Sequence, residues 1–123
     1  MTANRELSFT EKFLGTVDTM DAEAFANMFT EDGSFTFANN PPAVGRKAVA
    51  AQAQFVFDLI DGISHAHRGF WTVGNHEIME GRCTYHRKDG KVIELPYFSI
   101  ADLEGGLVKA YRAYVDGAPL LAK

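Results

Sequence analysis

Hydrophobic and polar positions alternate at helical spacing in the first thirty residues. Residues 8–18 open with Ser8 and Glu11, the separation of a capping box, and hydrophobic side chains then recur every three or four positions. Asp21 is a favourable N-cap for a second amphipathic helix with Phe29 in its apolar stripe. The Glu-Asp-Gly sequence that follows ends this helix. The pattern therefore predicts two short helices, each with one buried face.

A strand, a loop and a third helix come next. The sequence "SFTF" at 34–37 predicts a strand with Phe35 and Phe37 on one face. Residues 38–45 contain Asn-Asn-Pro-Pro, which continues neither a helix nor a central strand, so this segment is predicted as a loop. Residues 46–61 return to helical spacing, and a glycine then ends the helix.

The second half of the chain changes to the period of strands. Glycine- and asparagine-containing turns are predicted at 74–75, 88–90 and 104–106. Between them the pattern predicts four strands of an antiparallel meander, at 64–73, 76–87, 91–102 and 107–116. The order α-α-β-α-β-β-β-β predicts an α+β fold with helices packed on one face of a curved sheet. Because no linker or repeat interrupts the pattern, we expect a single domain over residues 1–123.

Composition narrows the class of protein. Hydrophobic residues make up 46% of the chain and aromatic residues 12%, which is enough to build a core and argues against disorder. The net charge of −4 and the lack of a basic cluster argue against nucleic-acid binding. The single cysteine, Cys83, excludes an internal disulfide and fits a reducing compartment. Without a secretion signal or a long apolar run, the chain is expected to be a soluble cytoplasmic protein that does not enter a membrane.

Three stretches of sequence carry a resemblance to a known family. They are "FTEDGSFTF" after the second helix, "VGRKAV" at the start of the third, and the ending "GGLVKAYRAYVDGAPL". In this order they resemble the SnoaL-like branch of the nuclear transport factor 2-like superfamily, over nearly the whole chain. The resemblance implies three N-terminal helices on a strongly curved, mainly antiparallel sheet, which together form a cone with an internal pocket. Relatives include polyketide cyclases, ketosteroid isomerases, limonene epoxide hydrolases and scytalone dehydratases, so the fold does not fix the reaction.

The last strand supplies the first candidate for catalysis. In the cyclases and epoxide hydrolases that this chain resembles, an acidic residue near the end of this strand works in the pocket, and the Tyr-x-Asp match implies Asp116. An apolar cavity raises the pKa of a carboxyl group, which suits it to proton transfer. Strand alternation places Arg112 and Tyr114 on the same face, where they are predicted to bind substrate. The alternative is an exposed Asp116 at the turn before Gly117.

The sequence "HAHRGFW" supplies the second candidate. Alternation places His65, His67 and Trp71 on one face of their strand. A His-x-His pair can bind a metal, but no third ligand is suitably spaced, so we predict no metal site. We predict that His67 acts as a general base near neutral pH and that Trp71 binds a planar ligand. The alternative is that His67 is a hydrogen-bonded wall residue and His65 a partly exposed one.

Other polar and aromatic residues complete the predicted site. Ketosteroid isomerases carry an Asp base just after the first strand, and "FTFANNPP" holds no acid there, so that mechanism is not expected. Phe37 and Asn39 in this segment are predicted to contact the substrate. Tyr97 or Tyr114 is predicted to donate a hydrogen bond to a carbonyl oxygen, the alternative being a ring in the core with a solvated hydroxyl. Cys83 is predicted to be a small core residue, without the pattern of a Cys-His nucleophile.

Two classes of function follow from these residues. The first is an enzyme that needs no metal or organic cofactor and performs acid/base chemistry on an apolar or polycyclic carbonyl compound, as a cyclase, isomerase or dehydratase. An epoxide-hydrolase-like reaction is a variant of it, although only Arg112 and Asp116 of that arrangement are present. The second is a non-catalytic module that binds a small apolar or aromatic metabolite. In either case a homodimer through the outer sheet face is expected, and its contact residues are predicted to be Met79, Tyr85, Tyr111 and Val115.

Overall fold

The computed structural model describes residues 8–121 of the chain. Its helices are α1 (Phe9–Asp18), α2 (Ala22–Ala26), α3 (Arg46–Phe57) and α4 (Ala118–Leu121). Its strands are β1 (Phe29–Phe37), β2 (Ala43–Val44), β3 (Ile60–Val73), β4 (His76–Arg87), β5 (Val92–Glu104) and β6 (Leu107–Val115). None of the helices described is long and apolar enough to cross a membrane.

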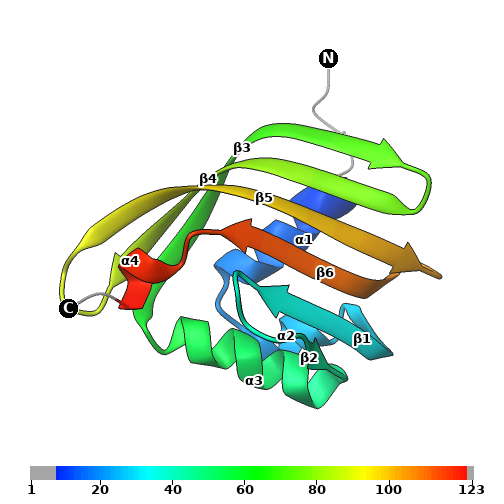
Figure 1. The fold of residues 1–123 in the computed structure, drawn as a ribbon, viewed down its shortest axis with the longest axis horizontal. Helices are drawn as coiled ribbons and strands as arrows, with labels where there is room; N and C mark the ends of the chain where they lie inside the picture. Colours follow the sequence, from blue (N-terminus) through cyan, green and yellow to red (C-terminus); the bar gives the residue numbers. More distant parts are fainter. Residues whose placement is uncertain (1–7, 122–123) are drawn as a thin grey trace.

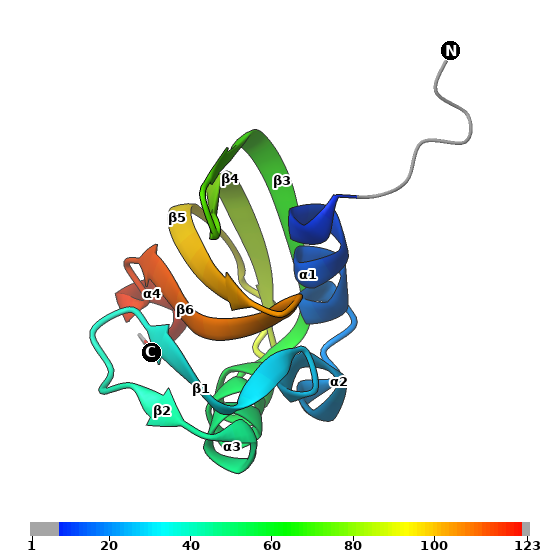
Figure 2. The ribbon, with the colours of Figure 1, turned by 90° about the vertical axis from the view of Figure 1, so that its right-hand side faces the viewer.

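The strands form one curved, unclosed sheet in the order β2-β1-β6-β5-β4-β3. Strands β3 to β6 pair with their neighbours in antiparallel fashion, which confirms the predicted meander. Strand β1 pairs in parallel with β6 and in antiparallel fashion with β2. Helices α1, α2 and α3 lie on the concave side of the sheet (Figures 1 and 2). The α+β class and the helices on one face of a curved sheet are therefore confirmed.

The helix ends follow the signals in the sequence, with two differences. The capping box is present, because the Ser8 hydroxyl accepts from the Glu11 backbone N–H (3.2 Å) and the Glu11 carboxylate accepts from the Ser8 N–H (3.0 Å). The predicted place of Phe29 in the second helix is wrong, since α2 ends at Ala26 and Phe29 begins β1. Helix α3 also ends before 61, because Ile60 already belongs to β3. In both places pairing within the sheet overrides the local helical pattern.

Aromatic side chains join the helices to the sheet. Phe13, Phe25 and Phe29 are almost fully buried. The Phe13 ring meets Tyr111 of β6 edge-on at 4.6 Å between centroids, and the Phe25 ring meets Phe35 of β1 at 5.3 Å. Such pairs contribute about 0.5–1.5 kcal/mol each beyond their burial. This cluster fixes α1 and α2 over the inner face of the sheet and so positions the cavity beside it.

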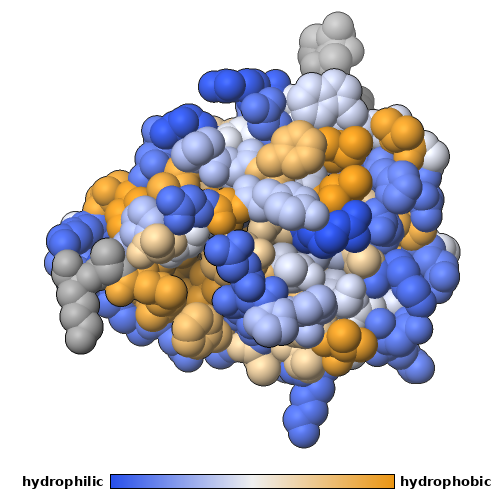
Figure 3. All heavy atoms as spheres, viewed as in Figure 1, coloured by the Kyte–Doolittle hydropathy of each residue, from blue (hydrophilic) through white to orange (hydrophobic). Residues whose placement is uncertain are grey.

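The residues predicted to form a dimer contact do not lie on the outer face of the sheet. The four residues expected to contact a second copy lie on the inner face, and three of them, Met79, Tyr85 and Tyr111, are buried. That prediction is wrong, because these residues of β4 and β6 face the helices and the cavity, whereas the face of β6 that carries Arg112 and Tyr114 is the outer one. The outer face bears three large exposed aromatic side chains, those of Trp71 (48%), Phe98 (45%) and Tyr114 (55%). Figure 3 views this face, on which apolar and polar side chains are interspersed.

Candidate functional site

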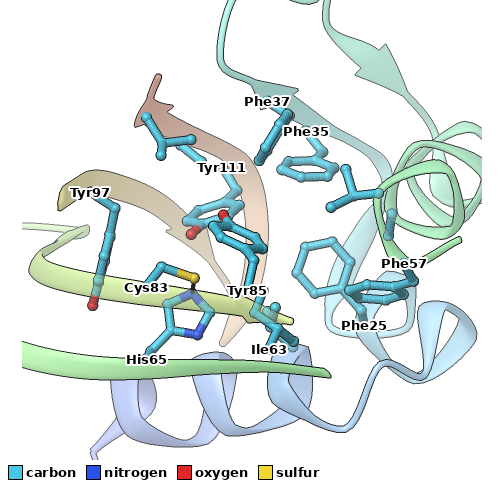
Figure 4. Close-up of a pocket in the computed structure, with 15 residues that line it drawn as sticks. Phe25, Phe35, Phe37, Phe57, Ile63, His65, Cys83, Tyr85, Tyr97 and Tyr111 are labelled. Carbon is cyan, nitrogen blue, oxygen red and sulfur yellow. Dashed lines mark hydrogen bonds between the residues drawn. The ribbon is translucent and has the colours of Figure 1, made fainter. Parts of the chain in front are cut away.

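An inner cavity of about 50 Å³ lies between the helices and the inner face of the sheet. Most of its wall is aromatic or aliphatic, from Val17, Phe25, Phe35, Phe37, Ala53, Val56, Phe57, Ile63, Ala113 and Val115. Five polar or titratable side chains also line it: His65, Cys83, Tyr85, Tyr97 and Tyr111. Figure 4 shows these five converging from β3, β4, β5 and β6. The cavity thus combines an apolar wall with a few convergent polar groups, as ligand sites do.

The last residue of α1 orients the histidine in this cavity. Asp18 Oδ1 lies 2.6 Å from His65 Nδ1, and Asp18 Oδ2 accepts the backbone N–H of His65 at 3.3 Å. The His65 side chain is only 8% exposed and that of Asp18 30%. Because a carboxylate can only accept, Nδ1 carries the hydrogen and the lone pair of the neutral imidazole is on Nε2. Asp18 and His65 therefore form an oriented acid/base pair.

Cys83 lies directly opposite His65 in the pairing of β3 with β4. Its Sγ is 3.4 Å from His65 Nε2 (Figure 4). Burial raises the pKa of the Cys83 thiol to about 12, so the sulfur keeps its hydrogen at neutral pH and donates to Nε2. The prediction that Cys83 is buried is confirmed. The prediction that it lacks a histidine partner is wrong, because the partner comes from the neighbouring strand.

Three tyrosine hydroxyls add hydrogen-bond donors. Burial raises the pKa of Tyr111 to about 12 and raises those of Tyr85 and Tyr97 above their usual values. All three therefore remain protonated and able to donate to a carbonyl oxygen. The Tyr97 hydroxyl lies 3.0 Å from His67 Nδ1, so Tyr97 connects the cavity with the second histidine.

A larger outer pocket of about 680 Å³ adjoins the inner cavity. Phe37, Val56 and Val115 line both spaces and form a neck between them. Figure 3 shows hydrophobic side chains gathered between α3 and α4, the helices that border this pocket. Its polar lining consists of Asn39, Asn40, Gln52 and Asp116. Within residues 8–121, the buried Nε2 of Gln52 has no hydrogen-bond partner.

The two predicted catalytic residues do not meet in one cavity. Asp116 is exposed and borders the outer pocket, where its Oδ1 accepts the backbone N–H of Ala118 at 3.1 Å. His67 is exposed too, and its ring packs on Phe70 at 4.7 Å between centroids. Partial desolvation of its ring against Phe70, with a smaller contribution from the nearby His65, lowers the pKa of His67. The catalytic roles of Asp116 and His67 stay predictions, and the geometry favours His65 with Asp18.

The predicted substrate-binding residues separate into two groups. Arg112, Tyr114 and Trp71 lie on the outer face and line neither pocket, because the alternate residues of β6 point inward. The guanidinium group of Arg112 instead donates to both carboxylate oxygens of Asp102, at 3.0 and 3.2 Å. The other three border the predicted site: Tyr97 in the inner cavity, Asn39 in the outer pocket and Phe37 in both.

Asp18 is the functional residue that the sequence reasoning missed. It lies four positions after Leu14, a fully buried residue, and so continues the apolar stripe of α1. A carboxylate at a buried stripe position needs a partner, since an unpaired charge is costly to bury. That signal was present in the sequence, but the partner is 47 residues away and only the fold brings it near.

Comparison with known proteins places this geometry in a family. The sequence profile of the SnoaL-like domain matches residues 10–111. No curated protein matches the chain. A hypothetical protein with a ketosteroid isomerase-like fold from Catenulispora acidiphila, solved with trimethylamine, has a TM-score of 0.80 at 15% identity, covering 87% of this chain and 84% of that one. A Shewanella putrefaciens protein described as a SnoaL-like polyketide cyclase has 0.79 at 13%, covering 95% and 86%. An NTF2-like protein from Anabaena variabilis has 0.78 at 21%, covering 88% and 84%. At these identities the likeness shows the fold alone.

Proposed function

Because this chain belongs to the SnoaL-like domain family, whose fold encloses a pocket, we propose that it is an enzyme of acid/base chemistry acting on an uncharged carbonyl compound. The reaction is an isomerisation, cyclisation or dehydration. One observation carries the proposal, namely that Asp18 holds His65 at 2.6 Å while His65 Nε2 faces an apolar cavity with tyrosine donors. A base oriented by a carboxylate beside hydroxyl donors is the arrangement that proton transfer next to a carbonyl requires.

The residues of the cavity divide the chemistry between them. His65 Nε2 takes a proton from the carbon next to the carbonyl group, and Asp18 stabilises the imidazolium that forms. A tyrosine hydroxyl donates to the carbonyl oxygen as its negative charge grows. The imidazolium then returns the proton to another carbon, which isomerises the substrate, or to a departing hydroxyl group, which dehydrates it. The thiol of Cys83 is a weak hydrogen-bond donor, so a substrate that enters the cavity breaks its hydrogen bond to His65 Nε2 and leaves this nitrogen free to act as the base.

The sizes of the two pockets define the substrate. A cavity that holds benzene measures about 150 Å³, so the inner cavity of about 50 Å³ admits only the reacting end of a molecule. The outer pocket, at about 680 Å³, is within the range of about 300–1,000 Å³ that is usual for ligand sites. Its unpartnered Gln52 Nε2 supplies a donor for a second oxygen of the ligand. These features support an apolar or polycyclic carbonyl compound that passes the neck at Phe37 and Val115.

The test begins with a thermal-shift screen of polycyclic ketones, epoxides and terpenoids. Each compound that raises the unfolding temperature is then incubated with the protein in heavy water, and incorporation of deuterium at carbon is followed by mass spectrometry. We expect incorporation by the natural protein and a large loss of incorporation in His65→Gln. The matched variant His86→Gln, at an exposed histidine that lines neither pocket, keeps the natural rate of incorporation. Compounds that bind without incorporation or conversion would overturn the enzyme and leave a ligand-binding module.

The outer face supports a proposal about assembly. Trp71, Phe98 and Tyr114 expose aromatic surface on the side of the sheet that no helix covers. We propose that this face pairs with a second copy of the chain, since aromatic residues are enriched in the centres of interfaces. The flanking charges, such as Arg82 with Glu94 at 2.8 Å, are of both signs and suit a self-complementary contact.

A further inference from the structure

We propose that Cys83 is a nucleophile that captures small apolar α,β-unsaturated carbonyl compounds in the inner cavity by conjugate addition. This activity goes beyond the proposed function, because His65 then takes a proton from the Cys83 thiol rather than from a carbon atom of the substrate. It rests on the same Asp18–His65 pair, but its product is a covalent adduct of the protein.

The geometry contains the three parts of an activated nucleophile. The Sγ of Cys83 is 3.4 Å from His65 Nε2, and His65 Nδ1 is 2.6 Å from Asp18 Oδ1. Nucleophile, base and orienting carboxylate follow one another in contact, the order found in catalytic triads. Cys83 also forms part of the cavity wall, so a bound molecule lies against its sulfur (Figure 4). The sulfur therefore has both a base and a place for an electrophile.

Burial of the thiol is compatible with this role. Serine nucleophiles of triads are protonated until attack begins, because the neighbouring histidine removes the proton as the new bond forms. Cys83 works in the same way, and reagents that depend on a preformed thiolate react with it slowly. In the resting structure the Cys83 thiol already forms a hydrogen bond to His65 Nε2, so no side chain has to move before the proton is transferred.

The electrophile follows from the lining of the cavity. The S–C bond forms at the β-carbon, the electrons of the C=C bond move onto the carbonyl oxygen, and His65 returns the sulfur's proton to the α-carbon. Nothing leaves and no water is consumed, which suits an apolar cavity of about 50 Å³. The hydroxyl of Tyr85, which lines the same cavity as Cys83, can donate to the enolate oxygen. An uncharged conjugated enone meets each of these conditions.

The experiment uses 3-buten-2-one, whose terminal C=C bond is small enough to enter the inner cavity, as the probe and intact-protein mass spectrometry as the readout, followed by peptide mapping. Because the chain has one cysteine, an adduct at sulfur can only be at Cys83. We expect one probe molecule added to the natural protein, none at this position in Cys83→Ser, and a rate at least about 100-fold lower in His65→Gln. The matched variant His86→Gln, at an exposed histidine that lines neither pocket, keeps the natural rate, and butan-2-one, which lacks the C=C bond, gives no adduct.

Two outcomes overturn the proposal. One is addition to Cys83 at the same rate in His65→Gln, which would mean that the thiol reacts unaided; the other is the absence of an adduct in the natural protein. If His65→Gln does not fold, as circular dichroism would show, Asp18→Asn serves as the second variant. Failure of the proposed function is distinguishable, because deuterium incorporation into a substrate does not need the sulfur and persists in Cys83→Ser.

Discussion

Replacement of Asp18 by Asn changes the histidine through hydrogen-bond direction alone. Asp18 accepts two hydrogens from His65, one from the backbone N–H and one from Nδ1–H. The backbone N–H can only donate, so the amide oxygen of Asn must face it as the acceptor. The amide N–H₂ group then points at His65 Nδ1. Two donors cannot share that contact, and His65 responds by moving its hydrogen to Nε2. The variant therefore keeps the shape of the site and removes the lone pair that faces Cys83.

The magnitude follows from the contacts that change. A base without its lone pair cannot take the proton of Cys83, and proton transfer of this kind contributes about 10²–10⁴-fold to rate. The same exchange of carboxylate for amide in a serine-protease triad costs about 10⁴-fold. The effect on folding is smaller, because a charge-assisted hydrogen bond becomes a neutral one. This lowers the free energy of unfolding by about 1 kcal/mol.

Two measurements test this reasoning. The ¹⁵N chemical shifts of the His65 ring report its tautomer directly, and mass spectrometry reports the rate of enone addition to Cys83. The matched control is Asp21→Asn, since Asp21 caps α2 through the backbone N–H of Ala24 and Asn caps a helix equally well. Hydrogen retained on Nδ1 in Asp18→Asn, or an unchanged rate of addition, would refute the mechanism.

Three further predictions concern the fold and the outer face. In Gly81→Ala the new Cβ would lie 2.1 Å from a carbonyl oxygen of β3, so this variant is expected to lower the free energy of unfolding, measured by urea titration, by about 2 kcal/mol or more. The control Gly15→Ala, whose Cβ would have nothing within 4 Å, is expected to raise that free energy by roughly 0.5–1 kcal/mol. Equal effects of the two substitutions would contradict the close approach at Gly81. The hydrogen bond from Arg112 lowers the pKa of Asp102 in the folded protein. The Asp102 carboxylate therefore stabilises the fold fully above its pKa in the unfolded chain, about 3.9, and this stabilisation is lost as the pH falls through the lower pKa of the folded state. Acid unfolding of Asp102→Asn should lack this component, and an identical pH profile would count against it. Trp71→Glu is expected to convert a dimer to a monomer in light scattering, and an unchanged mass would exclude the outer face as the interface.

The parts of the fold that depend on local pattern were predictable. The capping box of α1, the Asp21 cap and the turn at 74–75 all act within a few residues, and each is present. The parallel pairing of β1 with β6 joins residues more than seventy positions apart, and no local spacing reports it. Helix α4 has only four residues, too few to show a helical period.

The predicted site shows why alternation alone is insufficient. Alternation along β6 correctly assigns Arg112 and Tyr114 to one face and Tyr111 and Val115 to the other, but it does not say which face is inside. The resemblance directed attention to the face of Arg112 and Tyr114, whereas Tyr111 and Val115 line the cavity. The buried carboxylate comes from a helix, and its partner was identified only as one of two histidines on a strand. Of the residues predicted to bind substrate, Phe37 at the end of β1, Asn39 in the turn after it and Tyr97 on β5 do border the pockets.

One irregularity of the sheet brings His65 and Cys83 together. The turn at 74–75 pairs Val73 with His76, and continuing that register without interruption would place Thr84 opposite His65. A β-bulge between His67 and Gly69 adds one residue to β3 and shifts the register, so that Cys83 takes that place. Gly81 lies at the shift, where the backbone of β3 approaches too closely for any side chain. Because a shift of one residue exchanges the faces that meet, the bulge determines whether the histidine of this cavity faces a thiol or a hydroxyl. The contact on which enone capture depends is therefore set by backbone geometry at Gly81, two residues along β4 from Cys83, and no pairing rule applied to the hairpin turn alone would find it.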